Sequence, residues 1–120
     1  MPGALPPADL QRFKADFFKA LAHPLRIRLL ELLRARPRSV QELQAALGLD
    51  QSTVSQQLAV LRGKNVVGAH KEGTNVRYAV RDPLVGDLLD VARRIFNNQL
   101  AGTRTMLQEL RREARRPARR

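Results

Sequence analysis

Cysteine and tryptophan are both absent from this chain of 120 residues, and aromatic residues make up only 4% of it. Without cysteine the chain cannot form a disulfide, a thiolate metal site or a cysteine-based redox switch. With so few aromatic side chains, aliphatic residues must fill the core. The N-terminal segment lacks the basic and apolar regions of a signal peptide, and no apolar run reaches the roughly 18 residues of a membrane span. We therefore expect a cytoplasmic protein.

Acidic residues are scarce relative to basic ones: 11 Asp and Glu stand against 22 Lys and Arg, for a formal net charge of +11. This excess attracts polyanions, either nucleic acid or an anionic membrane surface, and charge alone does not distinguish the two. The hydrophobic fraction of 43% and the charged fraction of 28% are typical of a globular chain. We expect one domain over residues 9–112, with a disordered leader over residues 1–8 and a basic tail over residues 113–120.

Hydrophobic periodicity predicts a mainly α (α+β) fold with about five helices and one β-hairpin. The predicted helices lie at residues 8–22, 23–37, 40–49, 50–63 and 83–116. The hairpin is expected at residues 65–80, where Val, Thr and Tyr are frequent and Glu72-Gly73 falls near the centre. A short helix, a turn and a second helix followed by such a hairpin predict a winged helix-turn-helix.

Local signals mark the ends of the two helices at the centre of the chain. Ser39 followed by Glu42 predicts a capping box, and Gly48 predicts a left-handed C-cap. Asp50 or Ser52 is expected to cap the helix that follows. These signals place the turn of the helix-turn-helix between two well-defined helix ends.

The helix that begins near Asp50 carries two chemically different surfaces. Placing Val54 at the core centre puts Leu58 and Leu61 within about 40° of it, at ~100° per residue. The other faces carry hydroxyl and amide side chains, which can pair with base edges in the major groove of DNA. The candidate base contacts are Ser52, Thr53, Ser55, Gln56 and Gln57. The alternative is an ordinary capped and solvated helix start.

Four basic residues follow this helix or lie in the hairpin, and they are candidates for contacts to DNA phosphates. They are Arg62, Lys64, Lys71 and Arg77. Phosphate contacts supply affinity and position a protein on the duplex, whereas base contacts supply specificity. The alternative for these residues is an ordinary charged hairpin and a solvated helix end.

Three stretches of the chain resemble the arsenic-responsive and metal-responsive bacterial repressors of the ArsR/SmtB family. They are residues 17–33, 39–67 and 71–80, with the strings LAHPLR, STVSQQL and RYAV, and they cover most of residues 10–92. The resemblance implies a homodimeric winged-helix transcriptional repressor that binds double-stranded DNA at a palindromic operator. It also implies that the first and last helices pair across the two-fold axis.

The first helix favours a dimer independently, because it carries three of the four phenylalanines of the chain. This is more apolar surface than a leading helix needs in a monomer, and a partner subunit supplies burial that a short chain lacks. The candidate dimerisation residues on the first and last helices are Leu10, Phe13, Phe17, Ile95, Leu100 and Leu107. The apolar stripe of the last helix is irregular around Gly102, where a weak point is expected.

The chain differs from the metal sensors of the family at the positions where those sensors bind their ions. Arsenic and cadmium sensors carry cysteines on the third helix, and zinc and nickel sensors often pair aspartate with histidine on the last helix. Neither pattern occurs here. The candidate ligands that remain for a divalent metal such as nickel or zinc are His23, His70, Asp87 and Asp90. His23 also fits a local structural role and His70 a solvated strand position. A small effector or an accessory protein stays open as a partner.

Two further functions stay open from the sequence. One is a winged-helix module that binds protein or structured RNA without sequence readout, and the other is a membrane-surface protein using its basic final helix. The apolar stripe of that helix is expected to be committed to a dimer, so no membrane partner is expected. An enzyme is not expected, because the chain has no glycine-rich phosphate loop and no HExxH motif. A DNA-binding repressor would be associated with the nucleoid.

Overall fold

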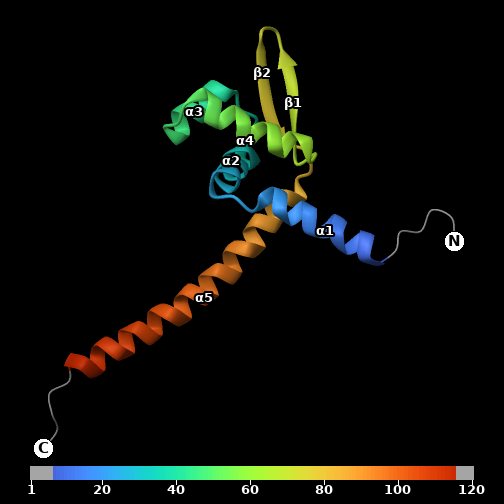
Figure 1. Cartoon of the computed structure of the whole chain (residues 1–120). Coiled ribbons are helices and arrows are strands. Elements are labelled where there is room, and N and C mark those ends of the chain that lie inside the picture. The colour runs from blue at the N-terminus through green and yellow to red at the C-terminus, as the bar shows by residue number, and fades with distance from the viewer. Residues whose placement is uncertain (1–6, 116–120) are drawn as a thin grey trace, which may run out of the picture. The chain divides into compact units, whose positions relative to one another are not determined.

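A computed structural model describes residues 7–115 of the chain. The elements follow one another, as Figure 1 shows, in the order α1 (Pro7–Leu21), α2 (Pro24–Ala35), α3 (Val40–Leu47), α4 (Gln51–Gly63), β1 (Val67–Glu72), β2 (Asn75–Val80) and α5 (Leu84–Arg115). Five helices with one antiparallel hairpin between α4 and α5 confirm the predicted winged helix-turn-helix.

The outer helices extend beyond the predicted domain at both ends. α1 begins at Pro7, inside the predicted leader, because proline is well tolerated in the first turn of a helix. α5 continues to Arg115, inside the predicted tail, and the basic side chains in its last turn interact favourably with the negative end of the helix dipole. The remainder of the predicted leader and tail, residues 1–6 and 116–120, lies outside the described residues.

The apolar core lies within residues 7–86, where α4 packs against α2, α3 and β1. The side chains that are at most 3% exposed are Ala20, Leu29, Leu30, Leu33, Leu43, Val54, Leu58, Leu61, Val66 and Val67. Complete burial of one leucine or valine side chain contributes about 1.5–3 kcal/mol. The three buried residues of α4 are those that the helical wheel predicts, so this face of the helix is its anchor.

Residues 87–115 form a separate unit, which consists of α5 alone. The predicted domain of residues 9–112 therefore spans both units. α5 runs through Gly102 without a break, because its backbone hydrogen bonds are made within the helix and one glycine costs only about 1 kcal/mol relative to alanine. Across residues 7–115, no helix is both long and apolar enough to span a membrane.

The ends of α3 are built as the sequence predicts. The Ser39 hydroxyl accepts a hydrogen bond from the backbone N–H of Glu42 at 3.2 Å, and the Glu42 carboxylate accepts one from the backbone N–H of Ser39 at 3.3 Å. At the other end, Gly48 adopts a left-handed φ of 68° and its N–H donates to the Gln44 carbonyl at 2.7 Å. Glycine takes this conformation without a Cβ penalty, which turns the chain directly into α4.

The hairpin is regular from its base to its tip. Val67 lies opposite Val80 at the base, and β1 and β2 stay in register up to the turn at Gly73, which has a φ of 61°. A positive φ is accessible to glycine in a tight turn. The turn therefore fixes which side chains of β1 and β2 share a face of the hairpin.

One backbone bridge joins the hairpin to the segment before α3. The Tyr78 N–H donates to the Arg38 carbonyl at 2.8 Å, and the Arg38 N–H donates to the Tyr78 carbonyl at 3.0 Å. The Arg38 side chain is also held, because its Nε donates to the Leu32 carbonyl at 3.1 Å. This bridge thus attaches the middle of β2 to the helix-turn-helix.

Candidate nucleic-acid interface

The outer surface of α4 presents the predicted hydroxyl and amide side chains. Ser52 and Gln56 are exposed, whereas Thr53, Ser55 and Gln57 are partly covered. This gradient follows from the helical wheel, since the partly covered residues flank the buried stripe. Ser52 and Gln56 are therefore the candidates that lie most open to a base edge.

The N-terminus of α4 is arranged differently from that of α3. Of the two predicted caps, Asp50 rather than Ser52 occupies the N-cap position, but its side chain makes no hydrogen bond to the backbone of the helix. Its carboxylate instead accepts a hydrogen bond from the Thr53 hydroxyl. Thr53 thus already donates its hydroxyl hydrogen within the protein, and while this bond is kept it can contact a base only as an acceptor.

Two basic candidates lie at the C-terminal end of α4. Arg62 is in the last turn and Lys64 is the C-cap residue, and both side chains are exposed. Arg62 also lines an open hollow of about 480 Å³ between the end of α4 and the base of the hairpin, together with His70 and Arg81. Two guanidinium groups at the edge of one hollow produce a positive potential that suits a phosphate.

The two basic candidates of the wing lie on opposite faces of the hairpin. Arg77 is paired with His70 across the strands, whereas Lys71 is paired with Val76, one residue further along each strand. Successive side chains in a strand point to opposite faces, so Lys71 and Arg77 cannot face the same surface. The sequence places both residues in the wing but does not reveal this separation.

Arg77 is engaged by two carboxylates. Its Nε donates to Glu72 Oε2 at 2.8 Å within the hairpin, and its Nη1 donates to Glu42 Oε1 on α3 at 2.8 Å. The second oxygen of Glu42 accepts a hydrogen bond from Arg36 Nη1, also at 2.8 Å. The sequence indicates Glu42 only as a capping residue, and no local signal links it to Arg77, which lies 35 positions away.

The ionisation of this cluster follows from its contacts. Arg36 first, then the Ser39 N–H, and then Arg77 lower the pKa of Glu42 to about 2. The pKa of Arg77 is raised, first by Glu72 and then by Glu42. These shifts keep both Glu42 and Arg77 ionised near neutral pH.

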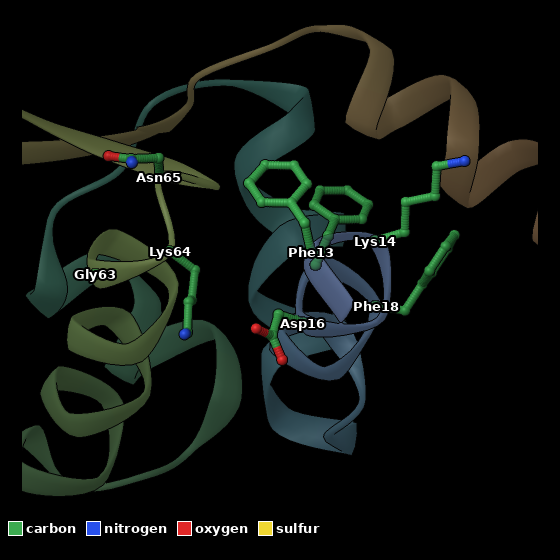
Figure 2. A pocket seen from close by; sticks show the side chains of 8 residues that line it. Phe13, Lys14, Asp16, Phe18, Gly63, Lys64 and Asn65 are labelled. Carbon is green, nitrogen blue, oxygen red and sulfur yellow. The ribbon is translucent and has the colours of Figure 1, made fainter. Parts of the chain in front are cut away.

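The predicted dimerisation residues of α1 are exposed or partly exposed to solvent. Phe13 is 70% exposed, Leu10 is exposed and Phe17 is partly covered. Phe13 and Phe17 line a pocket of about 390 Å³ between α1 and the turn after α4, which Figure 2 shows with Phe18 and Lys64 among its walls. Three phenylalanines around one open pocket form an apolar surface that water solvates poorly.

The predicted dimerisation residues of α5 are open as well, within the unit that this helix forms. Ile95, Leu100 and Leu107 are all exposed, as are the apolar side chains of Phe96 and Leu110. A helix that exposes so many large apolar residues along its length is not stabilised by packing of its own. α1 and α5 thus each carry apolar surface that lacks cover.

The four candidate metal ligands are spread over the start of α2, β1 and α5. His23 is the N-cap of α2, and its Nδ1 accepts a hydrogen bond from the Leu25 N–H at 3.1 Å. His70 is exposed on β1, and Asp87 and Asp90 lie in the first two turns of α5. Nowhere in residues 7–115 do three or more His, Asp or Glu side chains come together as a metal site.

Comparison with known proteins adds to this geometry. Residues 23–68, from the cap of α2 to the start of β1, match the family model of bacterial regulatory proteins of the arsR family. The chain is 47% identical over 103 residues to the uncharacterized HTH-type transcriptional regulator Rv0081 of Mycobacterium tuberculosis, covering 85% of this chain and 90% of that protein. It is 39% identical over 79 residues to a probable mercury resistance operon repressor of Streptomyces lividans, covering 66% of this chain and 63% of that protein.

Solved structures agree with the sequence matches. The crystal structure of Rv0081 superposes with a TM-score of 0.74 at 46% identity, covering 82% of this chain and 98% of that chain. The homodimeric winged helix-turn-helix DNA-binding domain of Mb0332 from Mycobacterium bovis superposes with a TM-score of 0.73 at 30% identity, covering 83% and 94%. On this sequence identity, coverage and fold, the chain belongs to the arsR family of bacterial regulatory proteins.

Proposed function

We propose that this chain is a transcriptional repressor that binds a palindromic operator in double-stranded DNA as a homodimer. The observation that carries the proposal is the geometry of α4, whose buried stripe anchors it to the core while Ser52 and Gln56 stay exposed. The net charge of +11 supplies attraction to the DNA backbone. Membership of a family of bacterial regulators supports the same function.

In this proposal α4 enters the major groove and its polar side chains contact bases. Ser52 and Gln56 are the principal contacts, and Ser55, Gln57 and Thr53 contribute from the flanks of the helix. Glutamine can bond an adenine through two hydrogen bonds, and serine can reach several base edges. Arg62 and Lys64 at the end of α4 and Lys71 on the wing contact phosphates, which adds affinity without adding specificity.

The homodimer follows from the apolar surfaces that the single chain leaves open. The exposed phenylalanines of α1 and the exposed stripe of α5 are covered by the second copy in this proposal. The related domain of Mb0332 is described as homodimeric, which supports the same assembly. Two α4 helices related by a two-fold axis require half-sites about 34 Å apart, or a multiple of that spacing.

A metal effector would have to use oxygen and nitrogen ligands. One relative is a probable mercury resistance operon repressor, but this chain has no cysteine with which to form a thiolate site for so soft a metal. We therefore propose nickel or zinc as the metal class to test, by titrating each ion into the metal-free protein during operator binding. A shift in the operator Kd with one of the ions supports a metal effector, and an unchanged Kd excludes both.

The experiment that tests the main proposal is selection of a preferred duplex. The protein is used to select sequences from a random DNA library, and the selected duplex is compared with a scrambled duplex at the same salt concentration. A repressor with an operator prefers the selected duplex by at least about 10³-fold. Equal affinity for both would overturn sequence-specific repression and support the module that binds protein or structured RNA instead. Genomic footprinting then locates the operator at the nucleoid, where a cytoplasmic repressor acts.

A further inference from the structure

One carboxylate connects three parts of the winged helix-turn-helix. Glu42 lies in the first turn of α3, where it completes the capping box with Ser39. Its Oε2 atom accepts a hydrogen bond from Arg36 at the end of α2, and its Oε1 atom accepts one from Arg77 on β2. α2, α3 and the wing therefore meet at a single side chain.

We propose that Glu42 is a positioning residue for DNA binding: through Arg77 it holds the wing in a fixed orientation relative to α4. The inference rests on the proposed function, because it concerns the same interface with DNA. It gives Arg77 a structural role in place of the direct phosphate contact that the sequence predicts. Glu42 itself does not touch DNA in this proposal.

The attachment of the hairpin shows what this contact adds. The backbone bridge between Arg38 and Tyr78 holds the middle of β2. Arg77 is the next residue towards the tip, and its contact to Glu42 adds a second point on α3. Val67 fixes the base of the hairpin in the core, so the contact between Arg77 and Glu42 acts on the part of the wing that lies beyond the bridge, towards the tip.

Glu72, the second carboxylate that bonds Arg77, makes a contact within the hairpin only. Glu72 and Arg77 are both residues of the hairpin, so their ion pair stiffens the wing but does not connect it to α3. Glu42 and Glu72 carry the same charge and bond the same guanidinium at the same distance of 2.8 Å. Glu72 is therefore a matched control for Glu42.

If Glu42 acts only through its charge, its removal changes the DNA affinity in one direction; if Glu42 positions the wing, its removal changes the affinity in the other. DNA repels carboxylates, so on charge alone the removal of either glutamate would strengthen DNA binding. If Glu42 positions the wing, its removal weakens binding in spite of the lost repulsion. The sign of the effect thus separates the two explanations.

The test measures the DNA affinity of Glu42→Gln, Arg77→Gln, the double variant and Glu72→Gln beside that of the wild-type protein. Each protein is titrated with the selected duplex and with its scrambled form over a series of salt concentrations. Glu42→Gln and Arg77→Gln are each expected to weaken binding to the selected duplex roughly three- to tenfold. The double variant should be no weaker than the poorer single variant, because both remove one interaction. Glu72→Gln should bind at least as tightly as the wild-type protein, and Arg77→Lys should retain most of the affinity.

The inference is overturned if Glu42→Gln binds the selected duplex as tightly as the wild-type protein or more tightly. It is also overturned if Arg77→Gln lowers the salt slope by about one, as loss of a direct phosphate contact does. If Glu42→Gln does not fold, Arg77→Gln decides, since Arg77 caps no helix, and unchanged affinity of that variant counts against the inference. A wild-type protein that selects no preferred duplex overturns the proposed function itself, and the inference with it.

Discussion

The recognition helix and the wing are held to the same core by different forces. α4 is anchored by three side chains that are at most 1% exposed, whereas beyond Val67 at its base the wing is attached by a backbone bridge and by ion pairs at the surface. Apolar burial involves no charge and is therefore not screened by salt or titrated by pH, whereas a surface ion pair is subject to both. The helix that we propose to contact bases is thus built into the core, and the ion pair that we propose to position the wing responds to solution conditions.

The largest expected effect tests the anchor of α4. Leu58→Ala removes a side chain that is 1% exposed and leaves a cavity beneath the helix. We expect the free energy of unfolding to fall by about 2–5 kcal/mol, measured by chemical denaturation. Val60→Ala, on the outer side of the same helix, should change it by less than about 0.5 kcal/mol. Equal losses in the two variants would contradict the assignment of a buried and an open face.

The next largest effect is expected on DNA binding, and it distinguishes the proposed base contacts of α4 from its buried face. Gln56→Ala should leave the stability of the fold unchanged, because this side chain is exposed. It should cost about 1–3 kcal/mol of binding at one base pair of the selected duplex and relax the preference there. A panel of duplexes with single base-pair changes measures this. Uniform weakening across the whole panel would show that Gln56 contacts the DNA backbone instead.

A smaller effect compares the two faces of the wing. Lys71→Gln should weaken binding to every duplex alike and lower the slope of log K against log salt concentration by about one, because one phosphate contact is lost. Arg77→Gln, on the opposite face of the hairpin, should leave this slope unchanged. Fluorescence anisotropy over a range of salt concentrations gives both slopes. The same slope change in both variants would mean that the faces are equivalent towards DNA.

The smallest expected effect is a dependence of stability on acid. The pKa of Glu42 is about 2 in the folded protein and 4.5 as the ordinary value, so the ionised form stabilises the fold. This stabilisation is complete above pH 4.5 and is lost as the pH falls towards 2. Denaturation of wild-type protein and Glu42→Gln at several pH values should show a difference that shrinks over this window. A constant difference would mean that Arg36, Ser39 and Arg77 do not act on the charge of Glu42.

Most of the fold could be predicted because its signals are local. The period of α4 gives its buried face, and Ser39, Glu42 and Gly48 give the ends of α3, since a cap depends on residues within one or two turns. The candidate base contacts at Ser52 and Gln56 follow from the same period. Their exposure agrees with the prediction, and their contact with bases stays a prediction.

The arrangement of the wing could not be predicted in the same way. The faces of Lys71 and Arg77 depend on the register of the hairpin, which the position of its turn determines. The contact between Glu42 and Arg77 joins residues 35 positions apart and depends on how the hairpin docks on α3. Neither periodicity nor motif spacing carries that information, because both describe only neighbours along the chain.

Tyr78 gives the wing an optical property of its own. It is the single tyrosine in a chain without tryptophan, and it lies at the backbone bridge that attaches the wing. The intrinsic fluorescence of the chain therefore arises at one position, with no tryptophan to quench it by energy transfer or to mask its emission. A change in the surroundings of the wing at this bridge can be followed in the unlabelled protein.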